Sequence, residues 1–392
     1  MNRAEKIAIL GTLPPLRGLS SYCLELALAM AEVASVEFIS FKSLYPAFAY
    51  PGGGLNEDDT FPGLEHPNLK VDRQLTWYNP ISWIKAGLFN NARLLHAQWW
   101  SPPLFPIYLA VCGTFKARRK PVVFTVHNTQ PHEKSFLFQK ISGVLFKLGD
   151  HFIVHTAVNK QQLVANYGIP PEKINLIPHG TLDFHVKQQV DRESIRTALG
   201  FTSSSKVILL FGAIRSYKGI DTALKAFAPV LRHAPDSRLL IAGKLWESWE
   251  PYSKLIEELN LKDTVLTHLE YIPSGDVYKF FTAADIVILP YHHFSSQSGV
   301  GASAVSFRKP LIVSRVGGLP DLVADPRSIV PPGDPAALAN ILIECLKSPG
   351  RLADMAAGAD MVARELTWSA IAKETTSVYR KVLKASDTIN GE

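Results

Sequence analysis

The segment that decides the fold of this chain is Lys206-Val-Ile-Leu-Leu-Phe-Gly-Ala-Ile-Arg-Ser-Tyr-Lys-Gly219. Its first part, Lys206–Gly212, is an apolar run with the length of one buried strand. A basic turn that contains glycine follows, and a helix is expected from near Asp221. Strand, loop and helix in this order form the unit from which open parallel α/β sheets are built.

The same order of elements repeats on both sides of this segment. The other apolar runs typical of strands are Lys6–Leu10, Val36–Phe41, Leu94–Ala97, Val122–Val126, Phe152–His155, Ile174–Ile177, Arg238–Gly243, Val265–Glu270, Asp285–Pro290 and Pro310–Ser314. Between Leu182 and Asp191 the apolar pattern lapses into a polar stretch. We therefore expect two α/β halves with parallel sheets, residues 1–185 and 186–371, and a ligand-binding cleft between them.

Capping residues predict where two of the helices begin. Ser20 fits the N-cap of a first helix, and Asp334 fits the N-cap of a helix over Pro335–Lys347, which starts with proline. Trp368 and Tyr379 are expected to be packing anchors in the final helices.

Composition places the chain among folded proteins and leaves the partner open. The 392 residues are 47% hydrophobic and 19% charged, with a net charge of +6. This excess favours anionic partners, which include nucleotides, phosphorylated acceptors, nucleic acid and an acidic membrane surface. Nucleic acid is disfavoured, because the sequence shows neither a basic stripe nor a known nucleic-acid-binding module.

Cysteine usage and hydropathy predict a cytoplasmic protein. Cys23, Cys112 and Cys345 are scattered and odd in number, which indicates free thiols in a reducing compartment. The N-terminus lacks the features of a signal peptide, and the apolar run from Leu104 to Phe115 is too short to span a membrane. Peripheral attachment to the inner face of the cell membrane remains an open alternative.

Two loops carry the chemistry expected of an anion site. In the first, Arg215 and Lys218 supply positive charge beside glycines that allow close backbone approach. In the second, small residues in the segment Pro290–Gly301 could present successive backbone N–H groups at a helix start. An ordinary turn with solvated cations, and a surface loop with a helix cap, fit these segments equally well. The chain carries neither a phosphate-binding P-loop motif nor a well-placed G-x-G-x-x-G.

Histidines stand at the ends of several predicted strands. They are His96, His127, His155 and His179. The carboxyl ends of parallel strands face the ligand in such sheets, so these positions are candidate site residues, with a hydrogen-bonded structural role as the alternative. Glu133 adds a carboxylate near the same edge, while His292 and His293 fit solvated loop positions better than metal ligands.

Further motifs follow one another in a fixed order. They are TVHN at Thr125–Asn128, IPHG at Ile177–Gly180, FGAIRSYKG at Phe211–Gly219, DIVILPY at Asp285–Tyr291, KPLIVSRVGGLPDLV at Lys309–Val323 and PPGDPAAL at Pro331–Leu338. This series, which runs over nearly the whole chain, resembles the family-4 retaining glycosyltransferases. The resemblance implies the GT-B fold, with two Rossmann-like domains facing each other across a cleft. It also implies that the first half binds the acceptor, that the second binds the nucleotide-sugar donor, and that a C-terminal helix, about 372–392, packs back on the first half.

The resemblance also assigns roles to individual residues. Arg215 and Lys218 would bind the donor diphosphate, and His127 would lie against the transferred sugar. The remaining donor-binding positions are Gly18, Ile272, Gln297, Ser298, Gly299, Val300 and Ser303. The family's loop arginine is replaced here by Ala213, and its two glutamates correspond to Ser295 and Ser303. Arg215 is expected to substitute for the missing loop arginine. Gln297 or Ser298 is expected to make the sugar contact that the family's first glutamate makes.

The function that the resemblance implies is retaining transfer of a hexose from a nucleotide-sugar, with UDP-glucose or UDP-N-acetylglucosamine favoured. The acceptor would be a glycan or a lipid-diphosphate-linked sugar in polysaccharide biosynthesis, and neither a metal nor a cofactor is expected. A nucleotide-sugar epimerase of the same fold and a non-catalytic partner subunit remain alternatives.

Two features of the first half bear on the acceptor. Trp77, Trp83, Trp99 and Trp100 are available for stacking on sugar rings or for core packing. The basic run Lys116–Lys120 could touch anionic lipid or be a solvated loop.

Overall fold

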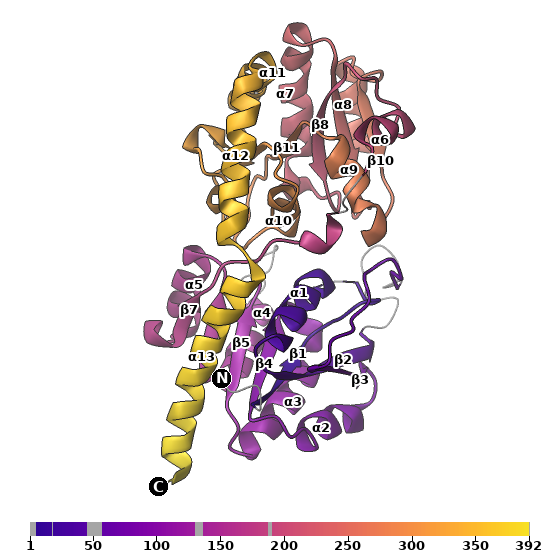
Figure 1. Ribbon diagram of the computed structural model, residues 1–392. Helices are drawn as coiled ribbons and strands as arrows, with labels where there is room; N and C mark the ends of the chain where they lie inside the picture. Colours follow the sequence, from indigo (N-terminus) through magenta and orange to yellow (C-terminus); the bar gives the residue numbers. More distant parts are fainter. Residues whose placement is uncertain (1–4, 18, 45–56, 130–135, 187–189, 392) are drawn as a thin grey trace. The chain divides into compact units, whose positions relative to one another are not determined.

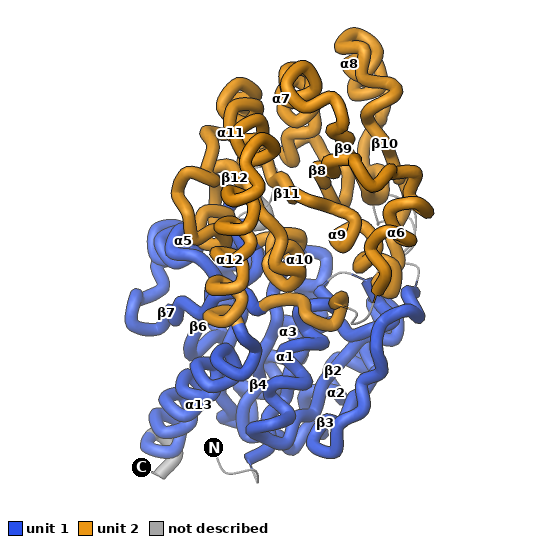
Figure 2. The backbone as a smooth tube through the Cα atoms, turned by 45° about the horizontal axis from the view of Figure 1, so that its top comes forward, with its two compact units in different colours: residues 1–180, 295–297, 367–392 blue, residues 181–294, 298–366 orange. Residues whose placement is uncertain are grey.

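The computed structural model describes residues 5–17, 19–44, 57–129, 136–186 and 190–391. The chain forms two compact units (Figure 2). Unit 1 contains Met1–Gly180, Ser295–Gln297 and Thr367–Glu392, and unit 2 contains Thr181–Phe294 and Ser298–Leu366. The chain therefore first leaves unit 1 after residue 180, whereas the sequence places the boundary at residue 185.

Unit 1 is built on a seven-stranded sheet in which all neighbouring strands are parallel, in the order β3-β2-β1-β4-β5-β6-β7. Its strands are β1 (Lys6–Leu10), β2 (Ser35–Ser43), β3 (Leu69–Thr76), β4 (Leu94–Trp99), β5 (Val122–Val126), β6 (His151–Val154) and β7 (Ile174–Leu176). The strand β3 is absent from the sequence prediction, because its pattern of half-buried and exposed residues gives it no continuous apolar run.

The helices of unit 1 are α1 (Ser20–Ala31), α2 (Pro80–Leu88), α3 (Phe105–Ala117), α4 (Phe136–Phe146), α5 (Ala157–Tyr167) and α13 (Trp368–Gly391). The last of these comes from the far end of the chain and packs beside α1 (Figure 1). The hydroxyl of the fully buried Tyr379 on α13 lies 2.6 Å from Nδ1 of His96 on β4. Trp368 and Tyr379 are therefore packing anchors, as the sequence predicts.

Unit 2 holds a six-stranded parallel sheet in the order β10-β9-β8-β11-β12-β13. Its strands are β8 (Lys206–Phe211), β9 (Ser237–Ala242), β10 (Val265–His268), β11 (Ile286–Leu289), β12 (Leu311–Ser314) and β13 (Ile329–Val330). Its helices are α6 (Arg192–Ala198), α7 (Ile220–His233), α8 (Glu250–Glu258), α9 (Val277–Ala283), α10 (Gly299–Ser306), α11 (Pro335–Lys347) and α12 (Pro349–Glu365).

Each sheet has a point where the strand order reverses, and this point positions the candidate site. In unit 2 the chain builds outward from β8 through β9 and β10, then returns to place β11 on the other side of β8. In open sheets of this kind the loops on the two sides of such a reversal lead to opposite faces of the sheet, and ligands usually bind at their common carboxyl edge. In unit 1 the same reversal lies between β1 and β4.

The two predicted helix caps have different outcomes. Asp334 is the N-cap of α11, and its carboxylate accepts from the backbone N–H of Ala337, as predicted. The prediction for Ser20 is wrong, because Leu19 is the N-cap and Ser20 is the first helical residue. The Ser20 hydroxyl instead donates to the carbonyl of Leu16 in the preceding turn.

The three cysteines and all the helices considered below lie in the described part of the chain. Cys23, Cys112 and Cys345 are all buried and form no disulfide. Within the described part of the chain, every helix is too short or too polar to pass through a bilayer.

Candidate functional site

The loop that follows β8 in unit 2 is shaped by two glycines in the left-handed region. Gly219, with a φ of 70°, precedes α7, and a Cβ at this position would lie 2.0 Å from the carbonyl oxygen of Pro290. Gly212, with a φ of 100°, follows β8 directly. The end of β11 thus presses against the start of α7, and only glycine fits there.

Lys218 is the buried cation of this loop. Its ammonium donates to the carbonyl of Phe211 at 3.3 Å and lies 5.6 Å from the centre of the Tyr291 ring. Burial, together with the neighbouring charge of Arg215, lowers the pKa of Lys218 to about 7. No carboxylate of the described residues pairs with Lys218, and a buried lysine near half-protonation in such surroundings is suited to receive an anion.

Lys218 and the start of α10 meet at Gly212. A Cβ on this glycine would lie 2.5 Å from Nζ of Lys218 and 2.9 Å from Cγ2 of Val300. The reversal of strand order thus brings the predicted cation of the β8 loop to the first turn of the helix after β11.

Arg215 lies between two aromatic rings. Its guanidinium carbon is 5.4 Å from the centre of the Tyr217 ring and 5.3 Å from that of Trp246. Such contacts orient the planar guanidinium without neutralising it, so its charge remains available to a ligand. Trp246 was missed by sequence reasoning, because it belongs to the loop after the neighbouring strand β9 and no motif marks it.

The start of α10 has the geometry expected of an anion-binding helix end. Ser298 is its N-cap, and the serine hydroxyl accepts from the backbone N–H of Gly301 at 3.2 Å. The helix begins at Gly299, followed by Val300, so small or short residues surround its first N–H groups. The partial positive charge at this end adds to that of Lys218.

Ser303, on α10, contacts His185. Its hydroxyl lies 3.3 Å from Nδ1 of His185, and Nε2 of the same ring lies 3.3 Å from the hydroxyl of Ser274. Both Ser303 and His185 are buried. His185 was missed because it lies in the polar stretch between the two halves, where the sequence shows no strand end.

The remaining predicted donor-binding residues are divided between the units. Ile272 is half-buried and packs against the core of unit 2. Gln297 belongs to unit 1, and its buried Oε1 has no hydrogen-bond partner within the described part of the chain. Gly18 and Glu133 lie outside the described residues.

His127, also in unit 1, belongs to a chain of hydrogen-bonded side chains. Its Nδ1 lies 3.3 Å from Nε2 of His155, and its Nε2 lies 3.0 Å from Oε1 of Gln98. His155 in turn donates from Nδ1 to the carbonyl of Ile177 at 2.9 Å. Both ring nitrogens of His127 therefore have partners inside the unit.

The buried histidines His96, His127 and His155 are uncharged at neutral pH. Burial, assisted by neighbouring histidines, lowers the pKa of His96 and the pKa of His155 to about 3 each. The pKa of His127 is also well below its usual value, for the same reasons. A neutral imidazole can exchange hydrogen bonds with sugar hydroxyls but carries no charge to oppose an anion.

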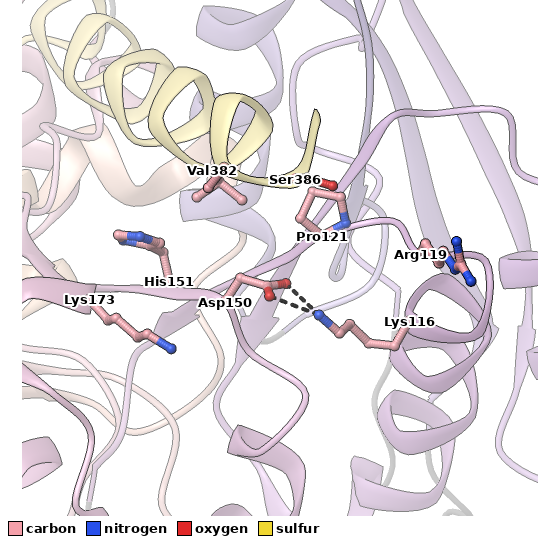
Figure 3. A pocket seen from close by; sticks show the side chains of 9 residues that line it. Lys116, Arg119, Pro121, Asp150, His151, Lys173, Val382 and Ser386 are labelled. Carbon is pink, nitrogen blue, oxygen red and sulfur yellow. Dashed lines mark hydrogen bonds and ion pairs between the residues drawn. The ribbon is translucent and has the colours of Figure 1, made fainter. Parts of the chain in front are cut away.

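The tryptophans of unit 1 differ in burial, and the basic run Lys116–Lys120 is partly engaged in an ion pair. Trp99 is fully buried and Trp77 is 39% exposed, so the first serves the core and the second is available at the surface. Lys116 forms an ion pair of 2.8 Å with Asp150, and this pair lines a hollow of about 610 Å³ (Figure 3). This hollow lies at the amino ends of β5, β6 and β7, the edge opposite to the predicted site.

The described residues contain no group of three or more His, Cys, Asp or Glu side chains that could hold a metal ion.

His292 is not simply solvated, since its Nε2 lies 2.9 Å from the hydroxyl of Thr222 and 3.2 Å from a carboxylate oxygen of Asp221.

Two family models match this chain in succession. A model described as "Glycosyltransferase Family 4" matches residues 16–181, and one described as "Glycosyl transferases group 1" matches residues 191–360. Together they cover well over half of the chain. The chain belongs to the family-4 glycosyltransferases.

Curated relatives of this glycosyltransferase carry the name D-inositol 3-phosphate glycosyltransferase. One from Segniliparus rotundus is 31% identical over 247 residues, which is 62% of this chain and 54% of the relative. One from Corynebacterium aurimucosum is 26% identical over 325 residues, which is 75% of this chain and 74% of the relative. In the first relative, as in several others, the match spans little more than half of the relative's length.

Solved structures confirm the fold of this glycosyltransferase as GT-B. Sucrose-phosphate synthase from Thermosynechococcus elongatus has a TM-score of 0.74 at 19% identity and covers 97% of this chain and 100% of its own. The Anabaena protein Alr3699/HepE, in complex with UDP and glucose, has a TM-score of 0.73 at 17% identity and covers 96% of this chain and 100% of its own. At these identities the likeness establishes the fold alone.

Proposed function

We propose that this chain is a retaining glycosyltransferase that moves a hexose from a UDP-sugar, with UDP-glucose or UDP-N-acetylglucosamine favoured, to a glycan or lipid-linked sugar in polysaccharide biosynthesis. The observation that carries the proposal is the buried ammonium of Lys218 beside the first turn of α10 in unit 2. A cation without a carboxylate partner, next to a helix N-terminus, is the arrangement that a diphosphate requires.

In this proposal, unit 2 stabilises the departing nucleotide diphosphate. Lys218, Arg215 and the N–H groups at Gly299 and Val300 oppose the negative charge that grows as the glycosidic bond breaks. The diphosphate oxygen then accepts the proton of the acceptor hydroxyl on the face from which it departs, so the anomeric configuration is retained. The protein contributes positioning and electrostatic stabilisation, and the proposal includes no metal and no cofactor.

The identity of the substrates rests on similar proteins. The Anabaena neighbour is known in complex with UDP-glucose, at 18% identity and a TM-score of 0.73, which supports a uridine nucleotide here. The curated relatives carry the name D-inositol 3-phosphate glycosyltransferase. A phosphorylated polyol therefore belongs in the acceptor panel beside glycans and lipid-linked sugars.

Unit 1 is proposed to bind the acceptor, with His127 against the transferred sugar. Because both of its ring nitrogens are already paired, a hydrogen bond to a sugar hydroxyl requires His127 to release Gln98 or His155. A cytoplasmic location with peripheral contact to an anionic membrane is part of the same proposal.

The test begins with nucleotide binding and continues to transfer. Thermal unfolding is measured with UDP, GDP, ADP and dTDP, and we expect the largest increase in Tm with UDP. The corresponding UDP-sugars are then incubated with each acceptor class, and NMR of the product gives the anomeric configuration. Retained configuration in an acceptor-dependent product supports the proposal.

The alternatives give different results in the same experiment. An epimerase would release free sugar without an added acceptor. A non-catalytic partner subunit would bind nucleotide without turnover, and the replacement of the family's glutamates by Ser295 and Ser303 is the observation that keeps this alternative open. Absence of any nucleotide-induced change in Tm would refute the donor site itself.

A further inference from the structure

Exposed apolar side chains gather on one helix of unit 1. Thirteen large hydrophobic residues are exposed in the described part of the chain, and six of them lie between Trp77 and Phe89, on α2 and the residues that flank it. The six are Trp77, Tyr78, Ile81, Ile84, Leu88 and Phe89, with Phe89 the most exposed at 70%. We call these six residues the α2 surface.

The packing of α2 among the described residues leaves these apolar side chains exposed. Ala86 and Gly87 are buried, and a Cβ on Gly87 would lie 1.7 Å from Oγ1 of Thr114, so this side of α2 is pressed directly onto α3. Ile81, Ile84 and Leu88 are three and four residues apart and share the other side. A helix that is apolar on both sides needs a second apolar environment.

Basic residues flank the α2 surface along the sequence, and two of them, Arg93 and Lys116, are paired with carboxylates from other segments. From Arg73 to His132 the sequence contains seven Lys or Arg residues and no Asp or Glu. Arg118 donates to the carbonyls of Gly87 at 3.0 Å and Asn90 at 2.6 Å, and thereby attaches the basic run Lys116–Lys120 to the end of α2. Lys85 adds a further exposed cation on α2 itself.

We propose that the α2 surface binds the headgroup region of an anionic lipid bilayer. Exposed tryptophan and tyrosine beside branched aliphatic residues, with lysine and arginine at the margin, suit a bilayer interface, where rings lie at headgroup depth and cations meet lipid phosphates. The inference deepens the membrane contact of the proposed function and rests on it. The proposed membrane contact then includes the α2 surface in addition to the basic run Lys116–Lys120.

Co-flotation with vesicles tests this inference without any nucleotide-sugar, so its failure is distinct from failure of the proposed transferase. Vesicles of neutral phosphatidylcholine are compared with vesicles that contain one quarter phosphatidylglycerol. Each cation near an anionic surface contributes about fivefold in binding, so we expect at least about tenfold tighter binding to the anionic vesicles.

Variants locate the contact on the α2 surface. The double substitution Ile81→Ser with Ile84→Ser removes two exposed side chains and should weaken vesicle binding by at least about tenfold. The matched control is Val158→Ser with Val164→Ser, which removes two exposed apolar side chains of α5 in the same unit and should leave binding unchanged. Lys85→Glu should weaken binding to anionic vesicles and leave binding to neutral vesicles unchanged.

Quenching by brominated lipid gives an independent readout. The part of the tryptophan fluorescence that is lost in Trp77→Phe should be quenched on vesicle binding. Equal binding to both vesicle types, or equal effects of the α2 and α5 variants, would overturn the proposal. So would a dimer in solution that the Ile81→Ser, Ile84→Ser variant dissociates while vesicles remain unbound, because the occupant would then be a second copy of the chain.

Discussion

At the scale of single residues, Lys218 and Arg215 show how the unit 2 loop differs from a turn with solvated cations. Lys218 is buried, and the half-buried Arg215 lies near the rings of Tyr217 and Trp246, so both cations have contacts within the protein. Burying an ammonium without a carboxylate destabilises its charged form, as the lowered pKa of Lys218 indicates. A bound diphosphate would reverse this effect.

The first prediction concerns turnover. Lys218→Ala and Arg215→Ala should each lower kcat by on the order of 10²-fold, because each removes one cation that opposes charge on the leaving diphosphate. Steady-state kinetics with the best UDP-sugar measure the effect. Lys225→Ala serves as the control, since this cation is half exposed and pairs with Asp221. Wild-type kcat in both loop variants would remove them from the site.

The second prediction concerns protons taken up on binding. The free Lys218 has a pKa of about 7, and a diphosphate beside it should raise that pKa, so UDP binding takes up a proton. The affinity for UDP should therefore fall by up to about tenfold per pH unit above pH 7. Calorimetry between pH 7 and 9, in buffers of different ionisation enthalpy, counts the protons. Lys218→Arg, which stays charged, should bind UDP without this dependence.

At the scale of elements, one carboxylate fastens α6 to the sheet of unit 2. Asp285 lies 2.6 Å from Arg196 and 2.6 Å from Arg192, and it accepts from the backbone N–H of Val207 at 2.7 Å. Arg196 is only 3% exposed, so its charge depends on this partner. The cluster therefore holds α6 against the start of β8 and the start of β11.

The third prediction follows from this cluster. Asp285→Ala should lower the free energy of unfolding by about 3–5 kcal/mol, because it leaves a buried guanidinium without its counter-charge. Asp360→Ala, which breaks surface pairs with Arg308 and Arg364, should cost at most about 1 kcal/mol. Urea unfolding of both variants measures the difference. Equal losses would show that the Asp285 cluster behaves as a surface ion pair.

At the scale of the whole molecule, stability should depend on the uncharged histidines of unit 1. His96, His127 and His155 are buried, and their pKa values are lowered in the folded state. Below the ordinary histidine pKa of about 6.5, the unfolded chain binds protons that the folded chain excludes. Stability is thus greatest above pH 6.5 and is lost as the pH falls toward the folded pKa values.

The fourth prediction gives this loss a size. Each of the three histidines should reduce the free energy of unfolding by up to about 1.4 kcal/mol per pH unit below pH 6.5. Urea unfolding at pH 7.5, 6.5, 5.75 and 5.0 measures the slope above the range where carboxylates dominate. A free energy of unfolding that is constant from pH 7.5 to 5.0 would show that these histidines are not held neutral.

The sequence alone determined the fold class, the GT-B resemblance and the chemistry of the β8 loop. Apolar runs of strand length and glycines next to cations are local features, so they can be read without knowing which strands are neighbours. The strand β3 (Leu69–Thr76) was not predicted, because a half-exposed strand has no continuous apolar run.

Tertiary structure decided which of these residues meet. Strand order places β11 beside β8, and this brings Val300 close to Gly212, which also lies next to Lys218, although Val300 and Gly212 are far apart in the chain. Tertiary structure also gave partners to both ring nitrogens of His127, placed Trp246 against Arg215, and left the apolar side chains on one face of α2 exposed among the described residues. The physical reason is that burial, pKa and contact depend on neighbours brought together by the sheet, whereas strand and loop formation depend mainly on neighbours along the chain.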